Sequence, residues 1–565
     1  MTYPLFDRGD LLALLRKRVS GFQAGYRQNL ALIGPAGMGK STLIRELLAQ
    51  ESKPGSLLLS FYLEIGLEES ASEWASRFIR TVLYAVLQLR KTEDFPARLS
   101  GFLELCAGLV PRTAALAARV EALSEAGRLD EAYEHLWELP GLVTQETGHR
   151  VLLVLDEFHR LRGFPLKEPF RSLGRKIMVQ STTLYVVASS EPAAAYSILA
   201  EGLALLFGKF EAVEMPPLTP AACRKAIRSG RAEGLEDPFT EYLLMDLAQG
   251  HPYRLDRLLE CWRRQDSLAD LLEALFLGSD SPFRQDFERR LRLIPAHRSR
   301  TFCLQVLESV AAGVHRLSHL AVQTQRPISQ VVSALRLLQD CRLVEKEGSF
   351  YRVPERLFQI WLITAYPILQ GIDLIGPDRA AAHFHRVIDV WTQRVREAAG
   401  RPMQGQLYDL LQLWDDEVVE LDGRKVLLPR FRQVERVPGL FEGASLLGRP
   451  MKRLKGGWWV VPWQGALVES QARQIVQQFR SFAPLKEHRK VLIGASPAEV
   501  NARLVLQEAK VRFWDLPALN QLLDLYGLTR LPVPAEADHP PALTVSLDET
   551  GLPAHRGSSS SQVAG

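Results

Sequence analysis

The chain has 565 residues, of which 47% are hydrophobic and 24% are charged, values that are ordinary for a globular protein of several domains. They exclude a fibrous or wholly disordered chain. The 69 basic and 65 acidic residues leave a formal net charge of +4, so any surface that binds nucleic acid is a local patch and not a field of the whole molecule.

The cysteines and the N-terminal residues indicate in which cellular compartment the protein is expected. The five cysteines are scattered and form no C-x-x-C pair: Cys106, Cys223, Cys261, Cys303 and Cys341. We therefore expect a reducing compartment and no structural zinc. The first ten residues include Arg8 and Asp10 and no apolar signal-peptide core, so we expect a cytoplasmic protein. The most membrane-like stretch, 357–372, is short and interrupted by polar residues, which predicts a buried helix followed by a turn.

The first motif along the chain is G-P-A-G-M-G-K-S, a full match to the phosphate-binding loop G-x-x-x-x-G-K-[S/T]. The apolar run at 29–33 predicts a buried parallel strand before it, and 42–48 has helical spacing after it. Lys40 is expected to neutralise the β- and γ-phosphates of ATP, and the Ser41 hydroxyl to ligate Mg²⁺. A glycine turn that binds nothing is the alternative. The predicted nucleotide-binding residues here are Gly34, Pro35, Ala36, Gly37, Met38, Gly39, Lys40, Ser41 and Thr42.

A second motif is the apolar strand 151–155, which ends in Asp156 and Glu157. This is typical of a Walker B motif, in which an Asp at the carboxyl end of a strand beside the P-loop strand holds Mg²⁺ and the following Glu orients or deprotonates water. We predict Asp156 and Ser41 as metal ligands and Glu157 and Lys40 as catalytic residues. The alternative is an acidic turn after a core strand, and a phosphate-binding loop upstream favours the Walker B interpretation.

The remaining elements of this half indicate an α/β fold with a parallel sheet. Further strands are predicted at 57–63, 183–188 and 210–215. Residues 72–139 carry long helical periodicities and predict a helical insertion. Ser190, which follows the strand at 183–188, is expected to lie beside the γ-phosphate and to take part in catalysis.

In this order the elements resemble the AAA+ side of the P-loop ATPases, in particular the archaeal-type ATPases that are related to the STAND and origin-recognition groups. The resemblance covers residues 5–360. It implies that Arg8, in the segment L-F-D-R, lies beside the nucleotide base, although Leu5 and Leu11 stand where the family has Phe and Glu.

The same resemblance implies several sensing residues. The pair Ser189–Ser190 resembles sensor 1, and G-H-P-Y at 250–253 resembles the element that begins the sensor 2 helix. Arg254 and Arg257 are therefore candidates for sensing the γ-phosphate, with a solvated helix face as the alternative. Lys209 stands where the group often has an arginine finger, and an ammonium lacks the planar fork of a guanidinium. This departure implies slow, switch-like hydrolysis.

Residues 300–353 have the spacing of a winged helix-turn-helix, with helices predicted at 301–312, 317–323 and 328–339 and a wing after them. In the third helix Val331, Val332, Leu335 and Leu338 are expected to face the core. Ser329, Gln330, Ser333 and Arg336 then face outward, in a polar surface that fits a major groove. In the families resembled here a winged helix also serves as a clamp or protein contact, so DNA binding by this helix stays open.

From about residue 376 the chain changes to helices rich in Arg, Gln and Trp, and then alternates strands and helices. The order resembles the restriction-endonuclease-like fold of the Mrr type, whose active members carry E-x-K on one strand. Pro462, Trp463 and Gln464 occupy those positions, which predicts a catalytically inactive domain. Pro462 also predicts an edge strand or a bulge. An unrelated small α/β domain is the alternative.

The sequence thus predicts five regions. They are a P-loop AAA+ core at 1–215, a helical lid at 216–290, a winged helix-turn-helix at 291–375, a restriction-endonuclease-like α/β domain at 376–530, and a disordered tail at 531–565.

The leading functional hypothesis is a Mg²⁺-dependent ATPase that acts as a slow molecular switch on double-stranded DNA or on a protein partner. By resemblance alone, its setting is genome defence or mobile-element biology, and we expect a homo-oligomer without membrane contact. A nucleotide-bound scaffold that does not hydrolyse ATP and an ATP-dependent nuclease are the alternatives.

Overall fold

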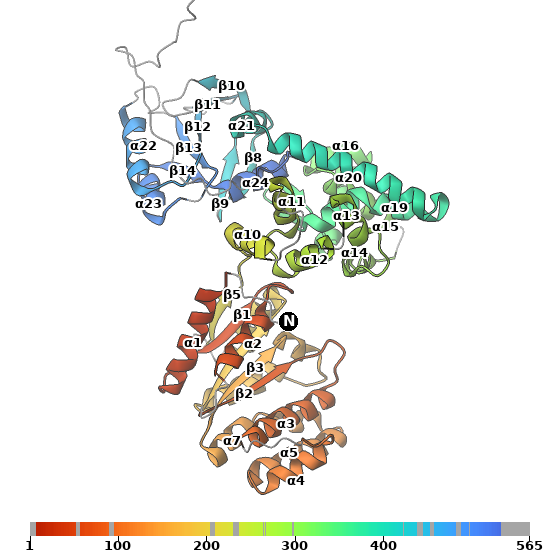
Figure 1. Cartoon of the computed structure of the whole chain (residues 1–565), viewed down its shortest axis with the longest axis vertical. Helices are drawn as coiled ribbons and strands as arrows, with labels where there is room; N and C mark the ends of the chain where they lie inside the picture. Colours follow the sequence, from red (N-terminus) through yellow and green to blue (C-terminus); the bar gives the residue numbers. More distant parts are fainter. Residues whose placement is uncertain are drawn as a thin grey trace, which may run out of the picture. The chain divides into compact units, whose positions relative to one another are not determined.

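The computed structural model describes residues 7–51, 57–89, 95–203, 210–229, 237–263, 265, 267–296, 299–421, 423–437, 445–451, 457–481, 488–496 and 498–532. The chain divides into two compact units (Figure 1). Unit 1 comprises residues 1–231 and 248–257, and unit 2 comprises 232–247 and 258–565. The expectations for Leu5, for Lys209 and for the tail from residue 533 onward lie outside the described residues.

Unit 1 is built on a five-stranded parallel sheet of strand order β2-β3-β4-β1-β5. Its strands are β1 Asn29–Ile33, β2 Leu58–Glu64, β3 Arg150–Asp156, β4 Thr183–Ser189 and β5 Phe210–Glu214. The central strands are continuously apolar because helices cover both faces of the sheet. The expected α/β class is confirmed. The expectation that the Asp156 strand lies beside the P-loop strand is wrong, because β4 lies between them. An apolar run specifies that a strand is buried but not which strand lies next to it.

Successive side chains of a strand point to opposite faces of the sheet, so the core of unit 1 has two layers, one on each face. Leu30 and Leu32 face α1 Gly9–Gln23 and α2 Lys40–Glu51, whereas Ala31 and Ile33 face the other side. The helices between residues 71 and 202 supply the layer on that second side and the helices packed against it. They are α3 Ala71–Gln88, α4 Leu99–Ala107, α5 Pro111–Glu125, α6 Leu129–Leu136, α7 Leu139–Thr147, η1 Phe158–Gly163, α8 Pro169–Val179, α9 Pro192–Ser197 and η2 Ile198–Gly202.

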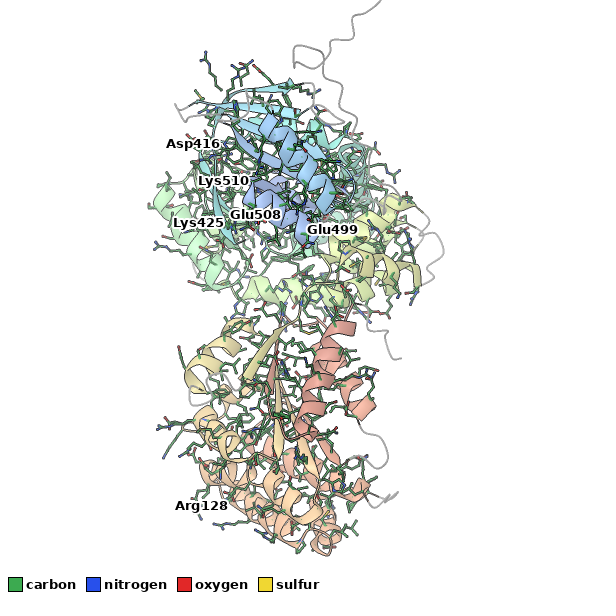
Figure 2. All side chains as sticks on the ribbon, turned by 90° about the vertical axis from the view of Figure 1, so that its left-hand side faces the viewer. Arg128, Asp416, Lys425, Glu499, Glu508 and Lys510 are labelled. Carbon is green, nitrogen blue, oxygen red and sulfur yellow. The ribbon has the colours of Figure 1, made fainter. Side chains whose placement is uncertain are left out.

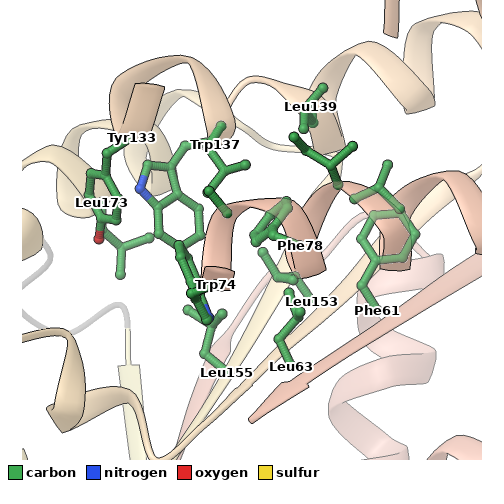
Figure 3. Close-up of a cluster of buried hydrophobic side chains, with 14 of the residues drawn as sticks. Phe61, Leu63, Trp74, Phe78, Tyr133, Trp137, Leu139, Leu153, Leu155 and Leu173 are labelled. Atoms are coloured by element: carbon green, nitrogen blue, oxygen red, sulfur yellow. The ribbon is translucent and has the colours of Figure 1, made fainter. Parts of the chain in front are cut away.

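Helices α3 to α7 form the predicted helical insertion, which an aromatic cluster joins to the sheet. Trp74 and Trp137 are buried with ring centroids 5.7 Å apart, and Phe78 meets Trp137 edge-on at 5.5 Å. Figure 3 shows these rings beside Leu153 and Leu155 of β3. Large aromatic side chains contribute most of the burial at such contacts. The insertion is therefore anchored on the strand that ends at Asp156.

The last of the chain's crossings between the two units lies within one helix. After β5 come α10 Pro220–Ser229, α11 Pro238–Ala248, α12 Pro252–Trp262, α13 Leu268–Phe276 and α14 Pro282–Arg292. Four of these five helices start directly at a proline, which suits the first helical position because its missing N–H would have no helical partner there. Helix α12 begins in unit 1 and ends in unit 2.

Three helices and a short hairpin follow in unit 2. They are α15 Arg300–Ala311, α16 Leu317–Thr324, α17 Ile328–Asp340 and the antiparallel strands β6 Glu345–Glu347 and β7 Phe350–Arg352. On α17 the four residues expected inside are buried or half-buried, and the four polar residues expected outside are exposed. The two predicted faces of this helix are therefore confirmed.

The next helices are α18 Arg356–Thr364, α19 Tyr366–Ile375, α20 Pro377–Ala399 and α21 Met403–Gln412. The single buried helix expected at 357–372 is thus two helices, because Pro367 lies in the first turn of α19 and favours a new start there. Among the described helices, none combines the length and apolar character needed to cross a membrane.

Two sheets complete unit 2. The antiparallel pair is β8 Glu417–Leu421 and β9 Arg424–Leu428. The five-stranded mixed sheet holds β10 Phe431–Val437, β11 Ser445–Pro450, β12 Trp458–Trp463, β13 Arg489–Gly494 and β14 Val511–Trp514 in chain order, with α22 Glu469–Ser481, α23 Val500–Glu508 and α24 Leu516–Leu525. Strands β12, β13 and β14 are parallel, and β11 is antiparallel to both of its neighbours.

The position of Pro462 corrects one expectation. Strand β12 is the middle strand of this sheet and runs in regular register with β13, where Pro462 lies opposite Ile493. It is neither an edge strand nor bulged there. Strand β11 pairs only with residues 458–460 of β12, so the proline occupies a stretch that is hydrogen-bonded on the β13 side alone and tolerates a missing N–H.

The β6–β7 hairpin packs into the core of the C-terminal sheets. Gly348 at its turn has φ +60°, and a Cβ at this position would lie 1.9 Å from the carbonyl oxygen of Val418. The Ser349 N–H donates to that same oxygen at 3.0 Å. Arg316 pairs with Glu417 at 2.6 Å, and Phe350 belongs to the hydrophobic cluster of the C-terminal part. The hairpin is therefore part of one continuous body with the last sheets.

Candidate nucleotide site at the carboxyl end of the parallel sheet

The glycine loop between β1 and α2 has the backbone conformation that phosphate binding requires. Gly37 and Gly39 have φ values of +76° and +88°, which glycine adopts without strain. Lys40 is 4% exposed, and its ammonium donates to the carbonyl oxygens of Gly34 at 2.7 Å and Pro35 at 2.9 Å. Burial lowers the pKa of Lys40, and the carboxylates of Glu157 and Asp156 oppose that shift. A cation thus lies at the start of α2, where the helix N–H groups also favour an anion.

His251, just before α12, and the first turn of α12 cover this loop. Nε2 of His251 lies 2.8 Å from the Ala36 carbonyl oxygen, and the Tyr253 N–H donates to the Gly37 carbonyl at 3.3 Å. A Cβ on Gly37 would lie 2.6 Å from Cε1 of His251. Burial and then the charge of Arg254 lower the pKa of His251 to about 4. The ring is therefore neutral near pH 7, with Nε2–H as the donor to the loop.

Asp156, at the end of β3, is fully buried, and its carboxylate accepts three hydrogen bonds. The Ser41 hydroxyl donates to Oδ2 of Asp156 at 2.6 Å, and Tyr62 OH donates to the same oxygen at 2.7 Å. The Glu157 N–H donates to Oδ1 at 3.0 Å. The structure thus brings together Ser41 and Asp156, the two predicted Mg²⁺ ligands, although they are 115 residues apart in the sequence. Oxygen donors of this type are the ones Mg²⁺ prefers.

Glu157 is held in place by backbone conformation and by the end of β4. Its φ of +55° and ψ of +39° lie in the left-handed region, which is uncommon for a residue other than glycine. Its Oε2 accepts from the Ser190 hydroxyl at 2.7 Å and from the Ser190 N–H at 3.0 Å. Because β4 lies between β1 and β3, Ser190 emerges between the glycine loop and Glu157. The predicted pair of catalytic residues Glu157 and Ser190 is in direct contact.

His159 is a member of this site that sequence reasoning missed. Its Nδ1 lies 2.9 Å from the Ser189 hydroxyl and 3.4 Å from Oε2 of Glu157, and its side chain is 9% exposed. Its Nε2 lies 3.7 Å from Glu191. Burial lowers the pKa of His159, while the two glutamates oppose that shift. The available signal was a histidine three residues after Asp156 in D-E-F-H; this histidine lies in the first turn of the short helix η1.

The other predicted residues lie around the loop. Arg8 is 3% exposed and donates to the Pro216 carbonyl at 2.8 Å and the Met38 carbonyl at 3.5 Å. Arg254 lies in the first turn of α12, where its N–H meets Nδ1 of His251 at 3.5 Å. Arg257 pairs with Asp256 at 3.1 Å, and its guanidinium lies 5.8 Å from the Tyr253 ring. Thr42 is on the exposed side of α2.

Residues 4–182 match the family model described as an AAA ATPase domain. The parallel sheet, the glycine loop and this match together define an ATP-binding ATPase domain of the AAA+ type in unit 1. No curated protein sequence matches the chain.

Three solved structures resemble the chain at low identity. A Walker-type ATPase of Pyrococcus abyssi is 16% identical, with a TM-score of 0.41 and coverage of 64% of this chain and 99% of its own. The Aeropyrum pernix ORC1 protein, solved in complex with DNA, is 16% identical with a TM-score of 0.35, covering 65% and 95%. The Aeropyrum pernix ORC2 protein, in its ADPNP and ADP complexes, is 14% identical with a TM-score of 0.38, covering 68% and 94%. At these values the resemblances assign no activity or partner to this chain.

Proposed function

We propose that this protein is a slow ATP-driven switch in which the nucleotide state of unit 1 controls how unit 2 engages DNA or a DNA-associated partner. The observation that carries the proposal is the convergence of Lys40, Ser41, Asp156 and Glu157 at one end of the parallel sheet, with Ser41 and Asp156 in contact at 2.6 Å. These are the side chains that bind a triphosphate with its metal and position water.

Each of these side chains has a distinct role in the proposal. Lys40 exchanges its bonds to the Gly34 and Pro35 carbonyls for phosphate oxygens, and Ser41 and Asp156 hold Mg²⁺. When bound, Mg²⁺ supplies neutralisation of the phosphate charge. Glu157 orients and deprotonates the attacking water. The buried oxygen pair of Ser41 and Asp156 suits a hard cation.

Slow turnover follows from the position of Glu157. Its Oε2 already accepts two hydrogen bonds from Ser190 and lies 3.4 Å from His159. A carboxylate held in this way is less free to turn toward an attacking water, and its Oε2 takes a proton only after part of this network is released. Ser190 and His159 therefore restrain the base, and we propose that this restraint, together with Lys209 in place of an arginine finger, favours a switch over fast turnover.

The chain itself provides a route from the nucleotide to unit 2. His251 and Tyr253 contact the loop, and α12, which begins at Pro252, continues into unit 2. A displacement of the loop by bound phosphate must be accommodated by this segment. We propose that Arg254 reports the γ-phosphate from the same first turn.

For the DNA-binding side of the proposal, we interpret α15, α16, α17 and the β6–β7 hairpin as a winged helix-turn-helix. Gly348 and Ser349 place the wing against Val418, so the wing does not enter a groove. The polar face of α17 with Ser329 and Arg336 stays exposed. Reversal of charge by Arg336→Glu is expected to weaken binding to duplex DNA, and unchanged binding would shift the contact elsewhere in unit 2.

We interpret the β10–β14 sheet as an inactive restriction-endonuclease-like domain, because Pro462 and Gln464 lack the carboxylate and the lysine of an active site. We further propose a homo-oligomer that acts in genome defence or on mobile elements. Light scattering with and without ATP and duplex DNA measures this assembly.

The test of the ATP switch is steady-state phosphate release by the full chain. Wild type is expected to turn over slowly with Mg²⁺, and Glu157→Gln to keep nucleotide binding while losing about 10²- to 10⁴-fold in rate. Glu131→Gln, which removes a surface carboxylate paired with Arg128 in the same unit, is the control and keeps its activity. Wild-type turnover in Glu157→Gln would move the base elsewhere. Bound nucleotide without any phosphate release by wild type would favour the scaffold alternative.

A further inference from the structure

An arginine cluster lies on the C-terminal sheet at the end opposite to Pro462 and Gln464. Arg489 opens β13, Arg512 lies in β14, and Arg424 opens β9. Trp458 lies directly opposite Arg489 in the register, and Val491, two residues after Arg489, lies opposite Arg512. Because alternate residues share a face, Trp458, Arg489 and Arg512 lie on one face of the sheet, at the amino-terminal ends of its parallel strands.

Trp458 brings two of the arginines together. The ring is 2% exposed, and its centroid lies 5.5 Å from the guanidinium carbon of Arg489 and 5.9 Å from that of Arg512. Both guanidiniums therefore lie within the range of cation–π attraction to the same buried ring. The ring supports the two cations and is too buried to stack with a ligand itself.

Arg424 adds a third positive charge from the other sheet. On β9 it shares its side with Val426 and Leu428, which are buried in the core between the two sheets, so it points toward the same face. Partial burial lowers the pKa of Arg512, and the positive charges of Arg489 and Arg424 lower it further. The three arginines thus repel one another at short range.

Among the described residues, no ion pair relieves this repulsion. In the part of the chain that the structure describes, no carboxylate forms an ion pair with Arg424, Arg489 or Arg512, and all three are exposed. Other exposed arginines of unit 2 do have an acidic partner, as Arg503 has in Asp515 at 2.8 Å. Two lysines, Lys425 and Lys510, labelled in Figure 2, lie at the starts of β9 and β14, but Lys425 alternates with Arg424 and lies opposite Glu420. With a net charge of only +4 for the whole chain, this is a local feature.

We propose that Arg424, Arg489 and Arg512 form a phosphate-binding surface for the backbone of a nucleic-acid strand. Guanidinium forks match phosphate oxygens bidentately, and neighbouring phosphates of one strand relieve the repulsion among several cations at once. Since the supporting ring is buried, no base stacks on it, and we assign the contact to phosphates, independent of sequence. This inference rests on the DNA-partner part of the proposed function and does not depend on ATP hydrolysis.

The experiment measures binding of a labelled duplex and a labelled single strand of about twenty nucleotides to the full chain over a range of salt concentrations. Arg489→Ala combined with Arg512→Ala is expected to weaken binding at least about tenfold and to reduce the slope of log K against log salt by about two. The control is Arg289→Ala combined with Arg292→Ala, which removes the same charge from an exposed part of α14 and keeps wild-type binding. Arg489→Lys with Arg512→Lys is expected to recover most of the slope and less of the affinity.

Four results would overturn the inference. They are no binding by wild type, an unchanged affinity and slope in the alanine variant, an equal loss in the control, and displacement by poly-glutamate as effective as by unlabelled DNA. Displacement by inorganic phosphate at low concentration would assign the surface to free phosphate instead. Thermal melting and tryptophan fluorescence report whether the alanine variant folds, and if it does not, the single variant Arg424→Ala is expected to reduce the salt slope by about one. Absence of phosphate release by wild type alone would contradict the ATP switch and leave this surface intact.

Discussion

Lys40→Ala is the most direct test of the nucleotide site. The Lys40 ammonium is 4% exposed and donates two hydrogen bonds, at 2.7 Å and 2.9 Å, to carbonyl oxygens of its own loop. Phosphate oxygens replace these acceptors when a triphosphate binds. Hydrogen bonds to charged groups contribute about 1.5–3 kcal/mol each, so the loss of two costs about 3–6 kcal/mol. The dissociation constant for ATP is therefore expected to rise at least about a hundredfold.

The same substitution is expected to spare the fold. Burial already disfavours the charged form of Lys40, since it lowers the pKa of this group, so removal of the ammonium also removes a cost of folding. The melting temperature without nucleotide should change little. Wild type should gain about 2.7 kcal/mol of stability at an ATP concentration of one hundred times its dissociation constant, and the variant should gain almost nothing.

Fluorescence titration with a labelled ATP analogue, together with thermal melting, measures both quantities. Lys176→Ala is the matched control, because Lys176 also lies in unit 1 and pairs at the surface with Glu138 at 2.8 Å. It should bind nucleotide as wild type does. A folded Lys40→Ala protein with unchanged nucleotide affinity would refute the assignment of the loop.

The remaining predictions concern unit 2. Asp246 is 4% exposed at its side chain; burial alone would raise its pKa, but Arg530 at 2.8 Å and Arg356 at 3.1 Å hold the pKa below its usual value. This stabilisation is complete above the unfolded-state pKa of about 3.9 and disappears as pH falls through the lower folded-state value. Asp246→Asn should lower the free energy of unfolding by about 3–5 kcal/mol at pH 7. Urea denaturation at several pH values should also show that the variant loses less stability than wild type as the pH falls through the acidic range. An equal loss in both proteins would contradict the ion-pair reasoning. Gly348→Ala should destabilise unit 2 by more than the roughly 1–2 kcal/mol that a left-handed alanine costs, because its Cβ meets a backbone carbonyl. Gly423→Ala is the control, since Gly423 has φ +69° and open space around the Cβ. Equal losses of stability in the two variants would rule out the clash. Purified protein should leave supercoiled plasmid intact with Mg²⁺ or Mn²⁺, and nicking that is lost on deletion of residues 376–565 would contradict the inactive-nuclease interpretation.

Local patterns in the sequence were sufficient for the glycine loop and for most elements. The run at 29–33, the G-x-x-x-x-G-K-S spacing and the following helix are specified by neighbouring residues, and the structure has them at β1, the loop and α2. Burial of both sheet faces explains why the strands read as continuous apolar segments. The two faces of α17 could be predicted for the same reason, since the helical period alone divides buried from exposed positions.

The arrangement of the site depends on strand order, which no local pattern contains. Apolar runs identified β3 and β4 but not that β4 lies between β1 and β3, and this order is what brings Ser190 to Glu157. His159 was missed because a histidine next to an acidic motif has no periodic signal. Its role becomes visible only when the ends of two strands meet.

Unit 2 gives the same lesson at longer range. The residue types of Gly348, Arg489 and Arg512 are plain in the sequence, but neither the approach of Gly348 to the Val418 carbonyl nor the meeting of two arginines over Trp458 has a sequence signature. Sequence by itself determined most of the helices and strands and the glycine loop, because these depend on neighbours a few residues apart. Only the tertiary structure decided which side chains share a site, because those contacts join segments tens to hundreds of residues apart. Which strands pair, and in which register, is set by the sheet as a whole and not by neighbours along the chain.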